Sequence, residues 1–267
     1  MSPALFLPQS VVVARLRTAG CVFAEREAPL LISAAQTPLE LATMLDRRAA
    51  GLPLEHVLGW AEFCGLRVAV DPGVFVPRRR TEFLVQQAIA LARSRAVVVD
   101  LCCGSGAVGA AIAAAQLEID LYAVDVEPAA VRCARSNLAA AGGQVHEGDL
   151  YEPLPRRLRG RVDIVVANVP YVPTAAIGLL PLEAREHEPR VALDGGADGL
   201  DVLRRVAAAA PGWLVPGGSL LIETSEDQAP RAVDALARHG LLARMVSSDE
   251  LDATVVIGIT PGDQAAG

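Results

Sequence analysis

The feature that most constrains the fold is a regular alternation of short apolar runs and amphipathic segments from residue 81 onward. The apolar runs predict strands at 96–101, 120–126, 162–169, 218–224 and 254–260. The amphipathic segments predict helices at 81–94, 106–116, 127–143, 198–214 and 227–240. Strands that are apolar on both faces and alternate with helices are typical of a parallel sheet covered on both sides. The predicted fold class is therefore α/β.

The N-terminal region has a different pattern, in which apolar residues recur at helical spacing. Thr37 is placed to cap a helix that has Pro38 at its first position and Glu40 at its third. The segment that follows alternates apolar and polar residues around a glycine and a Pro-Gly pair, which predicts a β-hairpin. We expect three parts: a helical domain (1–55), a hairpin linker (56–80) and a sheet domain (81–267).

Composition argues against several classes of protein. Hydrophobic residues make up 52% of the chain, yet no apolar run approaches the roughly 18 to 20 residues that span a bilayer. The N-terminal sequence lacks the basic head and cleavage site of a signal peptide, so we expect a cytoplasmic protein with no membrane contact. The five cysteines and four histidines form no metal-binding motif. A formal charge of −7 is unsuited to direct binding of DNA phosphates.

The loop after the first strand of the sheet domain, DLCCGSGAVG, contains the pattern GxGxxG at Gly104, Gly106 and Gly109. Asp125 closes the next strand about 20 residues later, as in dinucleotide-binding proteins. The same pattern occurs in nucleoside-binding methyltransferases, and a loop that merely needs glycine to turn is a third possibility. The pattern alone leaves these alternatives open.

Asp100, immediately before this loop, favours S-adenosyl-L-methionine over a dinucleotide. A carboxylate there would repel a pyrophosphate in a partly desolvated cleft, whereas it attracts the sulfonium and ammonium groups of S-adenosylmethionine. Asp125 is placed to accept both ribose hydroxyls. Asp149 is placed to reach the adenine amine, because it follows a further, third strand that is expected between the helix at 127–143 and the fourth strand at 162–169. Three acidic residues at successive strand ends are not explained by the need for a turn alone.

The fourth strand ends in Asn168, Val169, Pro170 and Tyr171, at the edge where open α/β sheets bind ligands. A planar amide or ring amine is a poor nucleophile because its nitrogen lone pair is delocalised. A site that accepts hydrogen bonds from both N–H groups favours the pyramidal nitrogen of the transition state. We expect the Asn168 side chain and the Val169 carbonyl to be these acceptors. Pro170 fixes the turn, and the ring of Tyr171 faces the planar group.

These residues carry a resemblance to a known family. The segment 168–171 resembles the NPPY motif of the protein-glutamine N(5)-methyltransferases, which modify the GGQ glutamine of peptide-chain release factors. Segments 54–82, 100–113 and 186–205 are similar to that family's linker, its cofactor loop and the segment after its catalytic motif. The resemblance implies a class I methyltransferase with a mainly parallel seven-stranded sheet. It also implies a helical domain that helps to recognise the protein substrate, and S-adenosyl-L-homocysteine as product.

The expected cofactor contacts come from several loops: Pro77, Arg78, Asp100, Cys102, Cys103, Gly104, Ser105, Gly106, Asp125, Val126, Asp149, Leu150 and Asn168. The expected glutamine site is Asn168, Val169, Pro170 and Tyr171. This chain departs from the family pattern at three places. Val169 replaces a proline, which leaves the carbonyl in place but loosens the backbone; Cys102 and Cys103 replace a glycine and a polar residue; Arg79 and Arg80 replace a proline and an acidic residue.

Two charged segments flank the motif. The run Arg78 to Arg80 is interpreted as a solvated basic turn in preference to a contact with an acidic partner or ribosomal RNA. Glu186, Glu188 and Arg190 lie just beyond the motif, where they are expected to form a lid or to position Arg78. Surface ion pairs are the alternative.

The first expectation for function is a monomeric protein-glutamine methyltransferase that acts on a release factor. A nucleic-acid amino-methyltransferase is second, because such enzymes share a similar four-residue motif. A small-molecule N-methyltransferase is third, and an inactive S-adenosylmethionine-binding or scaffolding protein is the fourth alternative. A nicotinamide dehydrogenase is disfavoured by the charge of Asp100.

Overall fold

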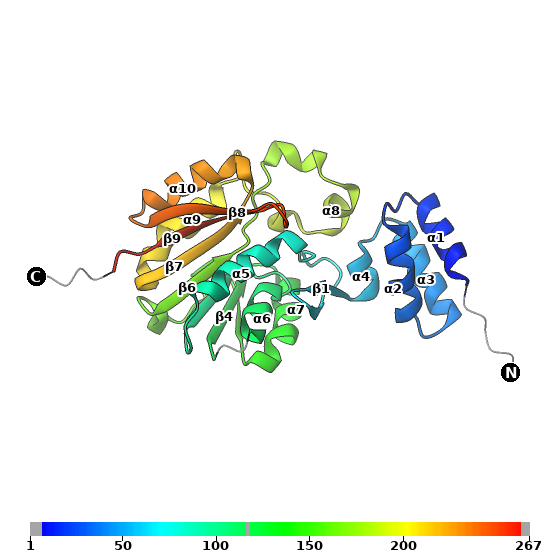
Figure 1. The fold of residues 1–267 in the computed structure, drawn as a ribbon, viewed down its shortest axis with the longest axis horizontal. Helices are drawn as coiled ribbons and strands as arrows, with labels where there is room; N and C mark the ends of the chain where they lie inside the picture. The colour runs from blue at the N-terminus through cyan, green and yellow to red at the C-terminus, as the bar shows by residue number, and fades with distance from the viewer. Residues whose placement is uncertain (1–6, 116–117, 263–267) are drawn as a thin grey trace, which may run out of the picture.

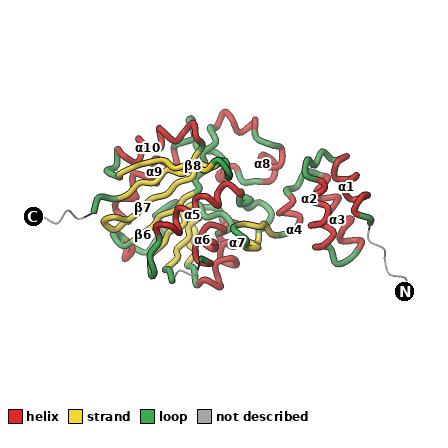
Figure 2. The backbone as a smooth tube through the Cα atoms, viewed as in Figure 1, coloured by secondary structure: helices red, strands yellow, loops and turns green. Residues whose placement is uncertain are grey.

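The computed structural model describes residues 7–115 and 118–262. A group of short helices at the N-terminal end lies beside a larger α/β part, with a two-stranded hairpin between them (Figure 1). Figure 2 shows the same division by secondary structure, since the long strands gather in the larger part and the small part is helical. The small helical domain and the hairpin linker of the predicted fold class are confirmed.

The N-terminal helices are α1 (Gln9–Thr18), α2 (Ala24–Ala34), α3 (Pro38–Ala49) and α4 (Leu54–Leu58). Their apolar faces meet in one core, in which Leu16, Leu31 and Leu45 are fully buried. α3 begins where the sequence predicts, because the Thr37 hydroxyl accepts a hydrogen bond of 3.1 Å from the Glu40 N–H. This domain therefore has a core of its own.

The linker hairpin pairs β1 (Trp60–Phe63) with β2 (Leu66–Ala69) in antiparallel register. Cys64 and Gly65 form its turn with positive φ angles of 49° and 73°, which is the backbone that a two-residue type I′ turn requires. Phe63 and Val68 are buried in a core shared with the α/β part. The hairpin is thereby fixed to the larger part of the molecule.

The larger part is built on one seven-stranded sheet in the order β5-β4-β3-β6-β7-β9-β8. Its strands are β3 (Val97–Leu101), β4 (Asp120–Asp125), β5 (Gln144–Glu147), β6 (Val162–Ala167), β7 (Leu214–Thr224), β8 (Leu242–Ser248) and β9 (Ala253–Ile259). The first five strands in this order are parallel, and β9 is antiparallel to both β7 and β8. The mainly parallel sheet is confirmed. The edge strand β8 has no apolar run in its sequence, LARMVSS, and its position was not predicted.

Helices cover both faces of this sheet (Figure 1). The first face carries α5 (Glu82–Leu91), α6 (Ala107–Ala114) and α7 (Pro128–Leu138), and the second carries α9 (Asp201–Ala209) and α10 (Ala229–Ala237). Successive strand residues alternate between the two cores, so that Val98 faces the first group and Val99 the second. Among the described residues, no helix is both long and apolar enough to cross a membrane.

The remaining elements are short. α8 (Leu182–His187) lies between β6 and α9. The 3-10 helices are η1 (Arg79–Thr81), η2 (Ala139–Ala141), η3 (Arg156–Leu158), η4 (Thr174–Leu179), η5 (Arg190–Ala192), η6 (Ala210–Gly212) and η7 (Glu226–Gln228).

The order of the strands creates a switch point between β3 and β6. The chain lays β3, β4 and β5 toward one edge of the sheet, and β6 then returns to the other side of β3. Loops that leave neighbouring strands in opposite directions open a crevice at the carboxyl ends, where α/β proteins bind ligands. The loops after β3 and β6 are 102–106 and 168–171, so the topology brings the two predicted motifs to one place.

Candidate active site

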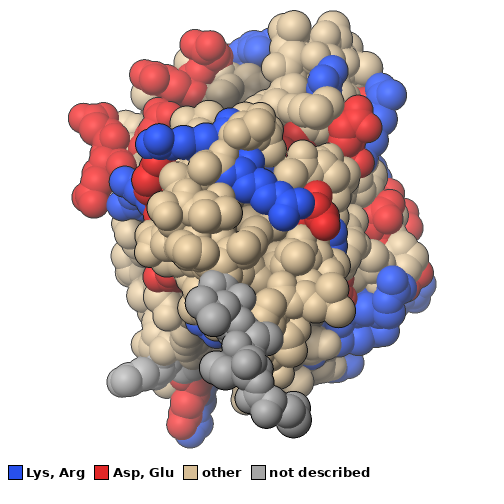
Figure 3. Space-filling model, turned by 90° about the vertical axis from the view of Figure 1, so that its right-hand side faces the viewer, with Lys and Arg blue, Asp and Glu red and all other residues tan. Residues whose placement is uncertain are grey.

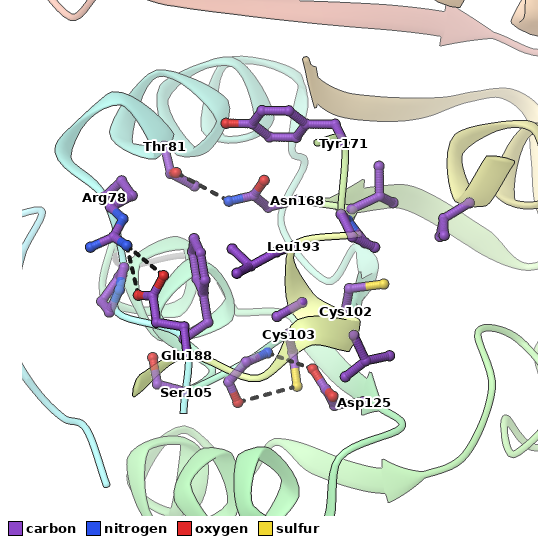
Figure 4. A pocket seen from close by; sticks show the side chains of 18 of the residues that line it. Arg78, Thr81, Cys102, Cys103, Ser105, Asp125, Asn168, Tyr171, Glu188 and Leu193 are labelled. Carbon is purple, nitrogen blue, oxygen red and sulfur yellow. Dashed lines mark hydrogen bonds and ion pairs between the residues drawn. The ribbon is translucent and has the colours of Figure 1, made fainter. Parts of the chain in front are cut away.

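A cavity of about 530 Å³ lies at the carboxyl ends of the central strands, which is a usual size for a small-molecule site. Every predicted site residue except Gly106 lines it. Figure 4 shows two groups of these side chains, with Asn168, Tyr171 and Thr81 at one end and Asp125, Cys103 and Ser105 at the other. The first group forms the acceptor end of the cavity, and the second group forms its loop end.

The loop end is shaped by backbone in the left-handed region. Cys102 and Gly104 both have a φ of 55°, and a Cβ added at Gly104 would meet no atom within 4 Å. The Gly104 N–H donates to Asp125 Oδ2 at 2.8 Å, and the Glu127 N–H donates to Asp125 Oδ1 at 2.9 Å. Each carboxylate oxygen keeps a further lone pair. Asp125 is thus held rigidly at the end of β4 and can still accept from a ligand's hydroxyl groups.

The two cysteines of this loop are uncharged. Burial, reinforced by the nearby carboxylates of Asp125 and Asp100, raises the pKa of both the Cys102 and the Cys103 thiols. Cys103 is 7% exposed and packs in the core against α6. These residues line the cavity as small neutral side chains.

Gly106 has a packing role instead of a cavity-lining one. Its φ is 78°, and a Cβ there would lie 3.1 Å from the Cβ of Ala134 in α7. The third glycine of the pattern, Gly109, lies in the first turn of α6 and donates its N–H to Asp100 Oδ2 at 3.0 Å. The glycine pattern therefore lets α6 approach both α7 and β3.

Asp100 lies at the floor of the cavity and is only 1% exposed. Burial raises the pKa of this carboxyl to about 7, the hydrogen bond from Gly109 opposes the rise, and Asp125 adds to it. A bound cation above Asp100 would favour its ionised form. The charge of Asp100 therefore depends on what lies next to it in the cavity.

Asp149 and Leu150 follow β5. Asp149 Oδ2 forms an ion pair of 2.5 Å with Nη2 of Arg205 in α9, a partner that the sequence did not suggest. Leu150 lines the cavity with a φ of 50°, which is uncommon for a branched side chain.

The acceptor end begins with Asn168, immediately after β6. Its Nδ2 donates to Thr81 Oγ1 at 3.3 Å (Figure 4). The amide oxygen Oδ1 then remains available, and no described residue donates a hydrogen bond to it or to the Val169 carbonyl. The Val169 side chain is 1% exposed and belongs to the core that includes Leu200. Its packing holds the turn at the position where the family motif has its first proline.

The turn after β6 is supported by the segment 193–199. The Val172 N–H donates to Leu193 O at 3.0 Å, and the Gly195 N–H donates to Val172 O at 2.9 Å. A Cβ at Gly199 would lie 2.3 Å from the Tyr171 carbonyl oxygen, so only glycine fits there. The same carbonyl accepts a hydrogen bond of 3.0 Å from Gln228 Nε2. These supports were not recognised in the sequence, since they come from distant segments.

Comparison with known proteins identifies the family. A Geobacter sulfurreducens protein named release factor glutamine methyltransferase is 39% identical over 226 residues, which cover 83% of this chain and 78% of that protein. A protein of the same name from Gloeobacter violaceus is 42% identical over 206 residues, covering 74% and 71% of the two chains. The chain belongs to the release factor glutamine methyltransferase family.

Two further comparisons concern the domain type and the fold. The model of the methyltransferase small domain matches residues 65–179. The crystal structure of a methyltransferase from Pyrococcus furiosus has a TM-score of 0.56 at 15% identity and covers 74% of this chain and 90% of that one, which shows the shared fold. Membership in a methyltransferase family of this fold implies dependence on S-adenosylmethionine, which decides against the dinucleotide alternative.

In this methyltransferase, the run Arg78 to Arg80 is only in part the solvated turn that the sequence suggested, because Arg79 and Arg80 are exposed while Arg78 and Arg80 also pair with buried carboxylates. Arg78 Nη2 donates to both oxygens of Glu188, at 2.6 and 2.7 Å. Arg80 contacts Glu223 and Tyr171. The expectation that Glu188 positions Arg78 is confirmed. Arg190 instead pairs with Asp194.

A second arginine joins the helical domain of this methyltransferase to the wall of the cavity. Arg48 of α3 is 7% exposed and bonds both oxygens of Glu27, at 2.7 and 3.0 Å. Its Nη1 donates to Glu183 Oε1 at 2.6 Å, and Glu183, in α8, lines the cavity. α8 is therefore held at one end by the helical domain and followed by Glu188, which binds the linker residue Arg78.

Proposed function

We propose that this protein transfers a methyl group from S-adenosyl-L-methionine to the side-chain amide nitrogen of a glutamine in a peptide-chain release factor, most specifically that of its GGQ motif. The observation that carries the proposal is the orientation of Asn168, whose Nδ2 is used by Thr81 and whose Oδ1 is left to accept. The names of the curated relatives support the same reaction.

The residues at the loop end fit S-adenosylmethionine. Asp125 would accept the ribose hydroxyls, and Asp149 would reach the adenine with the oxygen that does not face Arg205. The open backbone at Gly104 permits close approach of the ligand, and Val126 and Leu150 line the cavity there with apolar surface. Asp100 would favour the cationic part of the ligand. When bound, S-adenosylmethionine supplies an electrophilic methyl group.

The acceptor end would orient the glutamine amide. Asn168 Oδ1 and the Val169 carbonyl would accept its two N–H groups, so that the nitrogen lone pair leaves conjugation and can attack in line. Tyr171 would contact the planar amide with its ring. Burial first, and then Glu223, raises the pKa of the Tyr171 hydroxyl to about 12, so Tyr171 is not a base. The proton is lost after transfer, when the nitrogen is positively charged, and no base is needed before the attack.

We propose that residues 1–55 recognise the protein substrate, that residues 56–80 link this domain to the cavity, and that residues 81–267 bind the cofactor and hold the site. Val22, Phe23 and Leu39 leave apolar surface exposed on the helical domain, which suits contact with a protein. Figure 3 looks onto this end of the molecule, where positive and negative side chains are interspersed. That distribution does not favour nucleic acid. We further propose a monomer that works in the cytoplasm.

The test is an Asn168→Ala variant, with Ser136→Ala on the exposed face of α7 as matched control. Transfer of labelled methyl groups to purified release factor should be lost in Asn168→Ala and normal in the control. Titration calorimetry should show that both variants bind S-adenosylhomocysteine like the wild type. Near-normal transfer by Asn168→Ala would contradict the proposed role of the amide.

A further inference from the structure

Glu223 is an unexpected residue in a buried strand. It lies near the end of the apolar strand β7 and is 2% exposed. In the parallel pairing of β6 with β7, Ala167 is opposite Ile222, so the next positions along the two strands are Asn168 and Glu223. A buried carboxylate is costly unless its interactions offset the lost hydration. Its position beside the acceptor end suggests what those interactions serve.

The carboxylate of Glu223 connects both sides of the acceptor end. Its Oε1 accepts from Arg80 Nε at 3.2 Å and from the Tyr171 hydroxyl at 3.4 Å. Arg80 Nη2 also donates to the Tyr171 hydroxyl at 2.6 Å. These contacts form a triangle that fixes the edge of the Tyr171 ring.

Thr81 is the second connection. Burial raises the pKa of Glu223, and the Thr81 side chain is the largest of the influences that oppose this rise. Oε2 of Glu223 is buried, and no described residue forms a hydrogen bond with it. Thr81 lies close to this carboxylate, because it contacts Asn168 and directly follows Arg80, which pairs with Glu223, so Oε2 is an acceptor open to its hydroxyl. A hydroxyl that donates to a carboxylate keeps its lone pairs for other donors. The Thr81 oxygen is then left to accept the Asn168 Nδ2–H.

The direction of this hydrogen-bond chain matters because an asparagine amide can turn over. Its two ends have the same shape, and a threonine hydroxyl can either donate to the oxygen or accept from the nitrogen. If Thr81 donated to Asn168, the NH₂ group would face the acceptor end and would repel the N–H groups of a substrate amide. A carboxylate cannot donate, so its presence beside Thr81 selects one of the two arrangements.

We propose that Glu223 is a positioning residue, which sets the orientation of the Asn168 amide through Thr81 and the place of the Tyr171 ring through Arg80. This inference rests on the proposed function, since it assigns Asn168 the role of an acceptor for the substrate amide. Glu223 does not line the cavity, so it acts only through these neighbours.

The first test compares Glu223→Met, which has no acceptor of this kind, with Glu223→Gln, which keeps an oxygen. We expect kcat for release-factor methylation to fall about tenfold or more in Glu223→Met and less in Glu223→Gln, as for the loss of one oriented interaction at the reacting group. The KM for S-adenosylmethionine and the melting temperature should stay within error of the wild type. A fall in melting temperature or cofactor affinity that accounts for the lost activity would show a merely structural role and overturn the proposal.

The second test uses Thr81, so that the proposal does not depend on one variant that must fold. Thr81→Ser keeps the hydroxyl and should keep kcat, whereas the isosteric Thr81→Val should lose about as much as Glu223→Met. Combining Thr81→Val with Glu223→Met should cost little more than the larger single change, because both break the same chain of contacts. Effects that multiply would mean that Glu223 acts independently of Thr81 and would contradict the inference.

A third measurement separates this proposal from the proposed function. The side-chain amide resonances of Asn168 can be assigned in ¹H–¹⁵N spectra by their absence in Asn168→Ala. They should shift in Glu223→Met and in Thr81→Val, whatever the substrate is. Unshifted resonances in Glu223→Met would overturn the positioning role even if the release factor is methylated. If the resonances shift in the two variants but the wild type does not methylate release factors, the proposed substrate is rejected and the positioning role is kept.

Discussion

Replacing Asp100 with asparagine should stabilise the cofactor-free protein at alkaline pH. The carboxyl is 1% exposed, and burial raises its pKa from 3.8 to about 7. Because the folded-state pKa is raised, the stabilising effect of the bound proton is present at low pH and is lost as the pH rises through about 7. Asparagine keeps an acceptor for the Gly109 N–H at this place but does not titrate.

The size of the effect follows from the pH range over which the folded carboxyl is protonated and the unfolded one is not. Between about pH 5 and pH 7 the folded carboxyl holds its proton while the unfolded one has lost it, and each pH unit corresponds to about 1.4 kcal/mol. From about pH 5 to about pH 8.5 the wild type should therefore lose about 3 kcal/mol relative to Asp100→Asn.

Urea unfolding of both proteins at these two pH values measures this difference directly. Asp227→Asn, a change at an exposed residue of η7, is the matched control and should follow the wild type. S-adenosylhomocysteine should raise the melting temperature of the wild type more than that of Asp100→Asn, because the variant has no charge to offer the ammonium group of this ligand. Equal changes of unfolding free energy with pH in the wild type and Asp100→Asn would refute the reasoning.

Two further predictions concern parts of the structure that hold the site. Arg48→Ala should lower the free energy of unfolding by about 3 kcal/mol or more, because it leaves Glu27 buried without its cation; a loss below 1 kcal/mol in chemical denaturation would contradict this. Gly199→Ala should abolish methyl transfer and spare binding of S-adenosylhomocysteine, since a Cβ there would displace the Tyr171 carbonyl, 2.3 Å away. Gly178→Ala, where a Cβ meets no atom within 4 Å, is its control, and equal activity of the two variants would exclude the displacement.

Much of the fold was predictable because its determinants are local. The strands of the sheet interior are apolar on both faces, and Thr37 and the glycines mark helix ends by their own backbone preferences. The two motifs that line the cavity follow strands directly, so their meeting at one edge follows from the topology of an α/β sheet. The contact of Glu188 with Arg78 was also expected, as one of two roles considered for the charged residues after the motif.

The supports of the site were not predictable in the same way. Arg48 meets Glu183 across 135 positions in the sequence, and no local pattern links them. Glu223 is one charged residue in an apolar strand, and only the register of β6 with β7 shows that it lies beside Asn168. In the sequence, Gly199 cannot be told from any other loop glycine, because its close contact with the Tyr171 carbonyl is visible only in the structure. Contacts of this kind join distant segments of the chain, so they cannot be predicted from local sequence patterns.

The most direct test of the central claim is mass spectrometry of the organism's own release factor after incubation with this protein and S-adenosylmethionine. We predict a gain of one methyl group, located by fragmentation on the side chain of the GGQ glutamine and absent with Asn168→Ala. No gain on that glutamine, with S-adenosylhomocysteine binding intact, would contradict the proposed substrate and direct the search to other proteins, nucleic acids or small molecules.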